Sequence, residues 1–241
     1  MTEHTSRSGV RIAADFRDNL IIDRHDPVFA SMRASKRRHL RSANSEDAVT
    51  WNVFRSLRQI APAVWLNDLF TAAFPRKTLT HTEDATVELW KTVEPPPALP
   101  LDADEGESEL DVVIETPSVV WGIASATRST RDQVLRLIDV GSYHAGTRQF
   151  FFSLLIADAS KSKEGAAAID AYKDLVKPRE QLASHRPDRL ANLAGISRLA
   201  WADLGEVLAD AATDAGREDE RQYAERALAW LRGRATGKGG A

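Results

Sequence analysis

The sequence predicts an α/β fold in which helices flank a central mixed β-sheet and a helical extension follows at the C-terminus. Three features predict it. Two stretches rich in β-branched residues, 110–115 and 119–127, lie on either side of a proline turn and indicate a hairpin. An apolar run over 149–156 is typical of a strand buried on both faces. Helical periodicity then dominates from residue 196 onward.

The composition limits the classes of protein to consider. The chain has 241 residues, of which 43% are hydrophobic, enough for a substantial buried core. It has no cysteine, which excludes a disulfide framework, cysteine-bound zinc and thiol catalysis, and fits the cytoplasmic location that we expect. No apolar run approaches the roughly 18 residues that span a bilayer, so we expect no membrane partner. The net charge of −3 excludes a uniformly basic protein but allows a local basic surface.

Residues 1–43 are predicted to form an N-terminal basic arm or helix. The segment 31–43 contains no acid, and its cations are Arg33, Lys36, Arg37, Arg38 and Arg41. Such a cluster is either a solvated helix face or a patch that contacts the phosphates of a polyanion. In the second interpretation, Lys36, Arg37 and Arg38 bind nucleic acid.

A helix is predicted to begin near Asn44 or Ser45, because either side chain can cap it and two acids follow in its first turn. Its apolar residues recur at three- and four-residue steps from Val49 onward. Glu46 lies at the edge of this apolar face. It is either an ordinary helix-start acid or an acid directed at a site above the sheet. Apolar clusters over 62–82 predict further helix.

The turn of the hairpin is predicted to run from Thr116 to Val119, with proline at its second position. If Thr116 faces Val119, counting back along both strands places Asp111 opposite Ala124, about 5 Å away at Cβ. The side-chain period of two then puts Ala126 on the same face as Ala124.

Regular elements are also predicted on both sides of the hairpin. Thr86–Val93 alternates as a strand does, and a helix follows the hairpin from Thr130 to about Tyr143. These elements belong to a predicted core over residues 44–160. The remainder, 161–241, is predicted to be a helical extension packed on that core, with helices over 166–175, 196–212 and 218–232.

The stretch from Gly122 to Arg128 is informative because of what it lacks. Hydrolysis of a phosphodiester needs an activated water and charge neutralisation at the phosphate, which Mg²⁺ supplies when one or two carboxylates hold it. A lysine beside the metal can orient the water. An Asp on one strand and Glu-x-Lys on its neighbour provide this set of groups. Here Asp111 is present, but positions 124 and 126 are both alanine.

Over roughly residues 44–158 the chain resembles the PD-(D/E)XK, or restriction-endonuclease-like, superfamily. The resemblance rests on the helix that begins Ser45-Glu46-Asp47, on the strands 109–115 and 120–126, and on the helix and apolar strand that follow. It implies an α-β-β-β-α-β core that uses Mg²⁺ or Mn²⁺. Carried over, Asp111 resembles the metal-binding Asp and Glu46 the additional helix acid. Positions 124 and 126 resemble the sites of the family's Glu and Lys.

The function that this resemblance implies is metal-dependent cleavage of DNA, with Arg128 and Arg131 contacting phosphates near the cleaved bond. By analogy, the pathway is antiviral or foreign-DNA defence, and a homo-oligomer or a defence-system partner protein is compatible with it. The chain departs from the family pattern at both alanines, and Leu110 stands where proline precedes the Asp in the motif.

Several explanations of the alanines stay open. A parental glutamate at position 124 and a parental lysine at position 126 were replaced to inactivate the enzyme, or the chain is a naturally inactive homologue that binds nucleic acid or serves as a scaffold subunit. Alternatively, the true site lies elsewhere in the chain, or the protein is an α/β interaction protein unrelated to nucleases. We expect the chain as it stands to cleave DNA very poorly.

Overall fold

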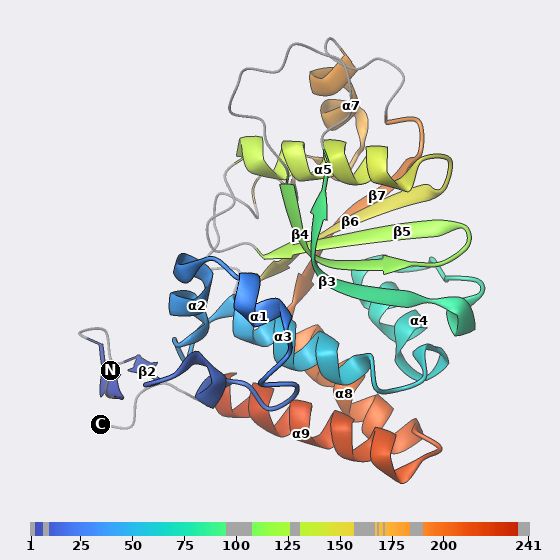
Figure 1. Cartoon of the computed structure of the whole chain (residues 1–241). Helices are drawn as coiled ribbons and strands as arrows, with labels where there is room; N and C mark the ends of the chain where they lie inside the picture. The colour runs from blue at the N-terminus through green and yellow to red at the C-terminus, as the bar shows by residue number, and fades with distance from the viewer. Residues whose placement is uncertain are drawn as a thin grey trace. The chain divides into compact units, whose positions relative to one another are not determined.

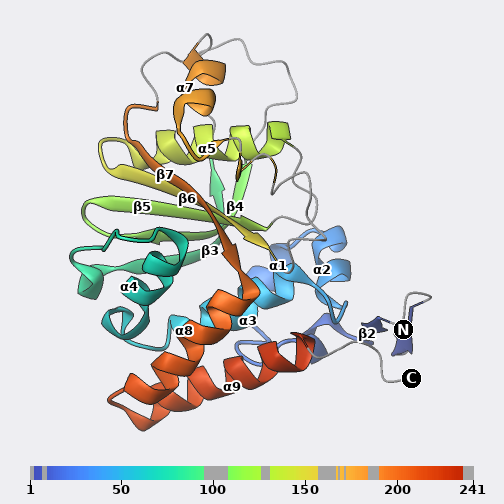
Figure 2. The same cartoon turned by 180° about the vertical axis from the view of Figure 1, so that it is seen from behind.

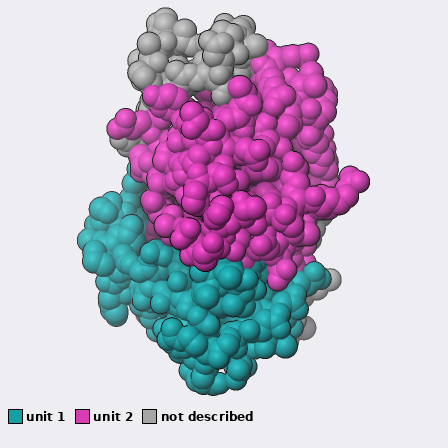
Figure 3. Space-filling view, turned by 90° about the vertical axis from the view of Figure 1, so that its right-hand side faces the viewer, with its two compact units in different colours: residues 1–65, 204–241 teal, residues 66–203 magenta. Residues whose placement is uncertain are grey.

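The chain divides into two compact units, which are described separately. Unit 1 comprises Met1–Trp65 and Leu204–Ala241, and unit 2 comprises Leu66–Asp203 (Figure 3). These limits differ from the predicted ones at residues 44 and 161. The computed structural model describes residues 3–6, 10–94, 108–125, 131–156, 167, 169–170, 172–183 and 190–235. Within these residues no helix is both long enough and apolar enough to cross a membrane.

Unit 1 is built around α3 (Glu46–Leu57), the helix predicted near residue 44 (Figure 1). Ser45 caps it, because its hydroxyl accepts a hydrogen bond from the N–H of Ala48 at 3.1 Å. Helix α9 (Glu218–Ala235) packs against α3. The N-terminal part of the unit adds short elements: β1 (His4–Thr5), β2 (Arg11–Ile12), η1 (Phe16–Asn19), α1 (Val28–Ser31) and α2 (Ala34–Leu40).

Unit 2 contains a five-stranded mixed sheet with the strand order β3-β4-β5-β6-β7 (Figure 1). Its strands are β3 (Thr86–Val93), β4 (Ser108–Glu115), β5 (Val119–Ser125), β6 (Gln149–Ile156) and β7 (Leu193–Ala200). The first three are antiparallel neighbours, whereas β6 is parallel to β5 and β7 is parallel to β6. Helix α5 (Arg131–Ala145) makes the crossover between β5 and β6, as a parallel pair requires.

Helices cover both faces of this sheet (Figures 1 and 2). On one face, α5 approaches β6 so closely that a Cβ added to Gly141 would lie 2.2 Å from the ring of Phe150, so only glycine fits there. On the other face lies α4 (Pro62–Ala73), where the Phe70 ring centroid is 5.3 Å from that of Trp121. Strand β5 therefore alternates between two buried environments, with Trp121 facing α4 and Ala124 in the core beneath α5.

The coarse prediction of an α/β fold is confirmed, with a mixed sheet flanked by helices and a helical C-terminal region formed by α8 (Trp201–Asp214) and α9. One prediction is wrong. The start of the helix expected over 196–212 is strand β7 at the edge of the sheet, and α8 begins only at Trp201. The apolar residues of this segment recur every third position, which mimics a helix, but pairing with β6 overrides the local pattern. The short helix α7 (Val176–Ala183) precedes it.

Candidate functional site

The hairpin of β4 and β5 has the predicted register. The N–H of Thr116 donates to the carbonyl oxygen of Val119 at 2.8 Å, and the paired residues continue from Glu115–Val120 to Val112–Ile123. The paired residues end at Val112–Ile123, and the same register continued by one pair would place Asp111 opposite Ala124. The cross-strand relation between Asp111 and Ala124 stays a prediction.

The Asp111 side chain is directed at the end of β5. Its Oδ2 accepts a hydrogen bond from the backbone N–H of Ser125 at 2.7 Å, and the residue is half-buried. The carboxylate thus lies next to the strand segment that continues toward position 126, and it is not turned into the apolar interior. This is the place where a carboxylate would share a cation with a ligand from β5.

Ala124 occupies a tightly packed position. It is 2% exposed and belongs to the apolar core beneath α5, together with Val134 and Ile138 of that helix and Leu154 of β6. Ala126 lies outside the described residues. A longer side chain at position 124 would therefore have to displace or repack these apolar neighbours.

Strand β3 is irregular at the level of Asp111. Trp90 has a φ of +54°, a left-handed conformation that bulky residues rarely adopt. The paired residues on either side are Leu89–Val112 and Lys91–Leu110, so the ladder between β3 and β4 skips Trp90 and Asp111. Local strain of this kind is concentrated at functional sites in proteins generally, which makes this level of the sheet a candidate.

The sequence also predicted Glu46, Arg128 and Arg131 as residues of the site. Glu46 is the first residue of α3 and is half-buried in unit 1, so its sharing of a metal with Asp111 stays a prediction. Arg128 lies outside the described residues. Arg131 is the first residue of α5, and its backbone alone is described.

The predicted nucleic-acid contacts Lys36, Arg37 and Arg38 all lie on α2. Arg37 and Arg38 are exposed, whereas Lys36 is half-buried and its Nζ lies 3.9 Å from Oδ1 of Asp47. The three residues thus have different environments within one short helix.

Another acid on β4, Glu115, is surrounded by cationic groups, and this cluster was not predicted from the sequence. Lys91 Nζ lies 2.8 Å from its Oε1, His144 Nε2 lies 2.9 Å from the same oxygen, and Arg148 donates to Oε2 at 2.7 Å. Lys91 also contacts Glu88 at 2.9 Å. Burial alone would raise the pKa of the Glu115 carboxyl, but the hydrogen bonds from these three side chains outweigh burial and lower its pKa to about 2.

The sequence contained no signal for this group, because its members come from β3, β4, the end of α5 and the loop after it. Only the fold brings them to one place. The oxygens of Glu115 accept hydrogen bonds from these three side chains. Glu115 is accordingly a structural acid, which joins two strands to the end of α5.

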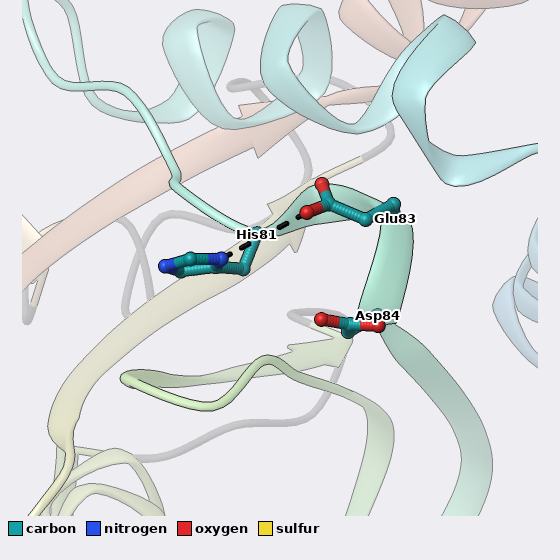
Figure 4. A group of neighbouring side chains, drawn as sticks. All are labelled: His81, Glu83 and Asp84. Carbon is teal, nitrogen blue, oxygen red and sulfur yellow. Dashed lines mark ion pairs between the residues drawn. The ribbon is translucent and has the colours of Figure 1, made fainter.

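One group of side chains within the described residues could hold a metal ion. His81, Glu83 and Asp84 each offer a ligand atom, and these atoms lie within 4.8 Å of one another (Figure 4). His81 Nδ1 is 3.8 Å from Oε1 of Glu83, and the ion pair is drawn in Figure 4. All three residues are exposed around the short helix η2 (Thr82–Asp84). Exposed acidic groups are common without a metal, so the group identifies neither an ion nor a reaction.

No protein-family model matches the chain, and a comparison with curated proteins gives no match. The functional conclusion therefore rests on the residues of the hairpin and on the fold that positions them.

Proposed function

We propose that the chain belongs to the lineage of PD-(D/E)XK nucleases, that its hairpin is the remnant of a site for metal-dependent DNA cleavage, and that Ala124 and Ala126 leave this site inactive. The observation that carries the proposal is the position of Asp111. Its carboxylate accepts a hydrogen bond from the N–H of Ser125 at the end of β5, and the hairpin register continued by one pair would place it opposite Ala124.

The order of elements supports the same lineage. Helices α3, α4 and η2 precede the three antiparallel strands β3, β4 and β5, and α5 and the parallel strand β6 follow. Apart from the additional helices α4 and η2, this order matches the α-β-β-β-α-β order that the resemblance implies. The irregular φ of Trp90 beside Asp111 adds local strain at the expected place.

The residues present would hold a divalent cation only weakly. Mg²⁺ in phosphoryl-transfer sites is typically held by one or two carboxylates, with water and phosphate oxygens completing its shell. Asp111 supplies one carboxylate here, and alanine at position 124 supplies no ligand. When bound, Mg²⁺ would neutralise charge at the phosphate and activate water. Alanine at position 126 cannot orient that water. The chain as it stands is therefore expected to bind DNA without cleaving it at a useful rate.

The direct test is a double variant, Ala124→Glu with Ala126→Lys, assayed on duplex DNA with Mg²⁺ and with Mn²⁺. We expect cleavage that depends on the metal, whereas the unmodified chain gives none. We also expect the double variant to be less stable without metal, because a second carboxylate then stands at the buried position 124. Added metal should raise its melting temperature, which is a readout independent of activity.

The matched control is Ala124→Gln with Ala126→Met, which reproduces the size of the side chains but removes both charges. It should neither cleave DNA nor respond to metal. A folded Glu/Lys variant, judged by circular dichroism, that shows no metal-dependent stabilisation and no cleavage would refute the proposed site.

One observation favours the alternative, a naturally inactive homologue that serves as a nucleic-acid-binding or scaffold subunit. Ala124 is fully packed among apolar neighbours, as expected if alanine is the natural residue at this core position. In that case the double variant should be destabilised at every metal concentration, because the core has lost the space for glutamate. The unmodified chain should still bind DNA.

A further inference from the structure

Helix α2 is held firmly on unit 1. Leu40 is fully buried at its C-terminal end, and Met32, just before the helix, is 8% exposed. The Asn19 side-chain amide donates to the carbonyl oxygens of Leu40 and Ser42, at 2.8 and 2.7 Å. The outer face of α2 is therefore displayed on a fixed support.

The five cations in and around α2 fall into two groups. Lys36 and Arg41 are turned toward unit 1, Lys36 near Asp47 and Arg41 donating from Nε to the carbonyl oxygen of Ala13 at 2.6 Å. The other three are exposed, and within the described residues none of them forms an ion pair: Arg33, Arg37 and Arg38. The structure thus separates cations with an internal role from cations that face solvent.

The exposed cations surround a small residue. Ala34 is exposed and precedes Arg37 and Arg38 by three and four residues, so both arginines are its neighbours on the helix surface. Arg33 directly precedes Ala34. An anionic group above Ala34 would therefore be within reach of Arg37 and Arg38 and would meet no bulky side chain at position 34.

We propose that Arg33, Arg37 and Arg38 form a phosphate-binding face that contacts the backbone of duplex DNA. Arginine is suited to this because its planar guanidinium binds phosphate oxygens in pairs. The segment 31–43 contains no acid that would weaken the positive electrostatic field of these arginines. The face includes Arg33 and omits Lys36, which the sequence had placed among the contacts.

Nucleic acid fits this face better than an anionic membrane does. A membrane-binding surface normally combines cations with exposed apolar side chains that enter the lipid. The exposed large hydrophobic residues of the described chain are Tyr143 and Val176, and both belong to unit 2. Binding at α2 goes beyond the proposed function, because it needs neither the hairpin nor a metal and would persist if the nuclease lineage were wrong.

The test measures duplex DNA affinity as a function of salt for the full chain and a triple variant, Arg33→Gln, Arg37→Gln and Arg38→Gln. Each phosphate contact contributes about 0.9 to the slope of log K against log salt, so losing three should lower the slope by about 2.7. Near 0.1 M salt we expect a loss of affinity on the order of 100-fold.

Three comparison variants keep the result interpretable. Arg24→Gln, Arg217→Gln and Arg221→Gln together remove the same charge from two exposed positions and one half-buried position of unit 1, and should leave the slope nearly unchanged. Replacing Arg33, Arg37 and Arg38 by lysine should retain most of the slope. Lys36→Gln alone should change the slope by less than the amount that one phosphate contact contributes, about 0.9.

The proposal is overturned if the unmodified chain shows no salt-dependent binding to DNA, or if both glutamine triple variants weaken binding equally. It is also overturned if the three arginines are required for binding to phosphatidylserine vesicles but not to DNA, which would assign the face to a membrane. Failure of the hairpin double variant leaves all these measurements unaffected, so the two proposals fail separately.

Discussion

Strand β4 carries three acids, and two of them, Glu115 and Asp111, differ in their described contacts. Glu115, near the turn of the hairpin, accepts hydrogen bonds from Lys91, His144 and Arg148. Asp111 lies four residues away, about 13 Å along the strand, and its Oδ2 accepts a hydrogen bond from the backbone N–H of Ser125. The first acid accepts hydrogen bonds from three cationic side chains, whereas the hydrogen bond described for the second comes from the backbone.

The difference separates a structural role from a candidate functional role. A carboxylate surrounded by the protein's own cations has a depressed pKa and links elements of the fold, as Glu115 does. The hydrogen bond described for Asp111 comes from a backbone N–H of the neighbouring strand, and the role proposed for this residue is to hold a cation. Sequence alone makes the two acids look alike, because both follow the same two-residue period on one strand.

The largest expected effect tests directly whether Asp111 and Glu115 differ in role. In the variant with Ala124→Glu and Ala126→Lys, adding Asp111→Asn should lower the rate of DNA cleavage by at least about 1,000-fold, since losing a metal ligand removes several kcal/mol of transition-state stabilisation. Adding Glu115→Gln instead should change the rate per folded molecule by only a few-fold. Equal losses from the two substitutions would show that the acids do not differ in role.

The second effect concerns stability. We expect Glu115→Gln to lower the free energy of unfolding by about 1–3 kcal/mol, between the values typical of exposed and fully buried ion pairs, because the group is partly exposed. It leaves Lys91 and Arg148 without their shared carboxylate. Urea denaturation at neutral pH measures the change, and a value indistinguishable from zero would contradict the structural role of Glu115.

The pH dependence of stability should carry the signature of the same residue. The pKa of Glu115 is lowered from 4.5 to about 2, so its contribution is fully present above about pH 4.5 and is lost as the pH falls toward 2. The gap in unfolding free energy between the unmodified chain and Glu115→Gln should therefore narrow between pH 5 and pH 3. A gap that stays constant over this range would mean that ionisation of Glu115 does not account for it.

Short-range signals predicted much of the fold. Strands β3 and β6 have the predicted limits, and Ser45 caps α3 as expected. The hairpin register followed from the turn alone, because Thr116 and Val119 fix every pair behind them. These features are set by residues close together in the chain, which is why they can be predicted from sequence.

The features that the sequence missed depend on distant contacts. Strand β7 exists because it pairs with β6, about forty residues earlier, and because Gly195 lets Phe74 and Phe151 approach its backbone. The cations around Glu115 likewise come from separate elements. At the candidate site, the sequence predicted Asp111 opposite Ala124. The burial of Ala124 and the hydrogen bond from Ser125 to Asp111 could be found only from the structure.

The smallest effect is expected for Asp111→Asn in the chain as it stands. The asparagine carbonyl oxygen can still accept the hydrogen bond from the N–H of Ser125, so the free energy of unfolding should fall by less than about 1 kcal/mol. Asp111→Ala removes that acceptor and should cost more, about 1–2 kcal/mol, because the N–H then lacks its acceptor. Thermal or urea unfolding of both variants beside Glu115→Gln measures the order. If Asp111→Asn proves as costly as Glu115→Gln, then the negative charge at Asp111 is itself required by the fold, and its retention no longer points to a cation from solution.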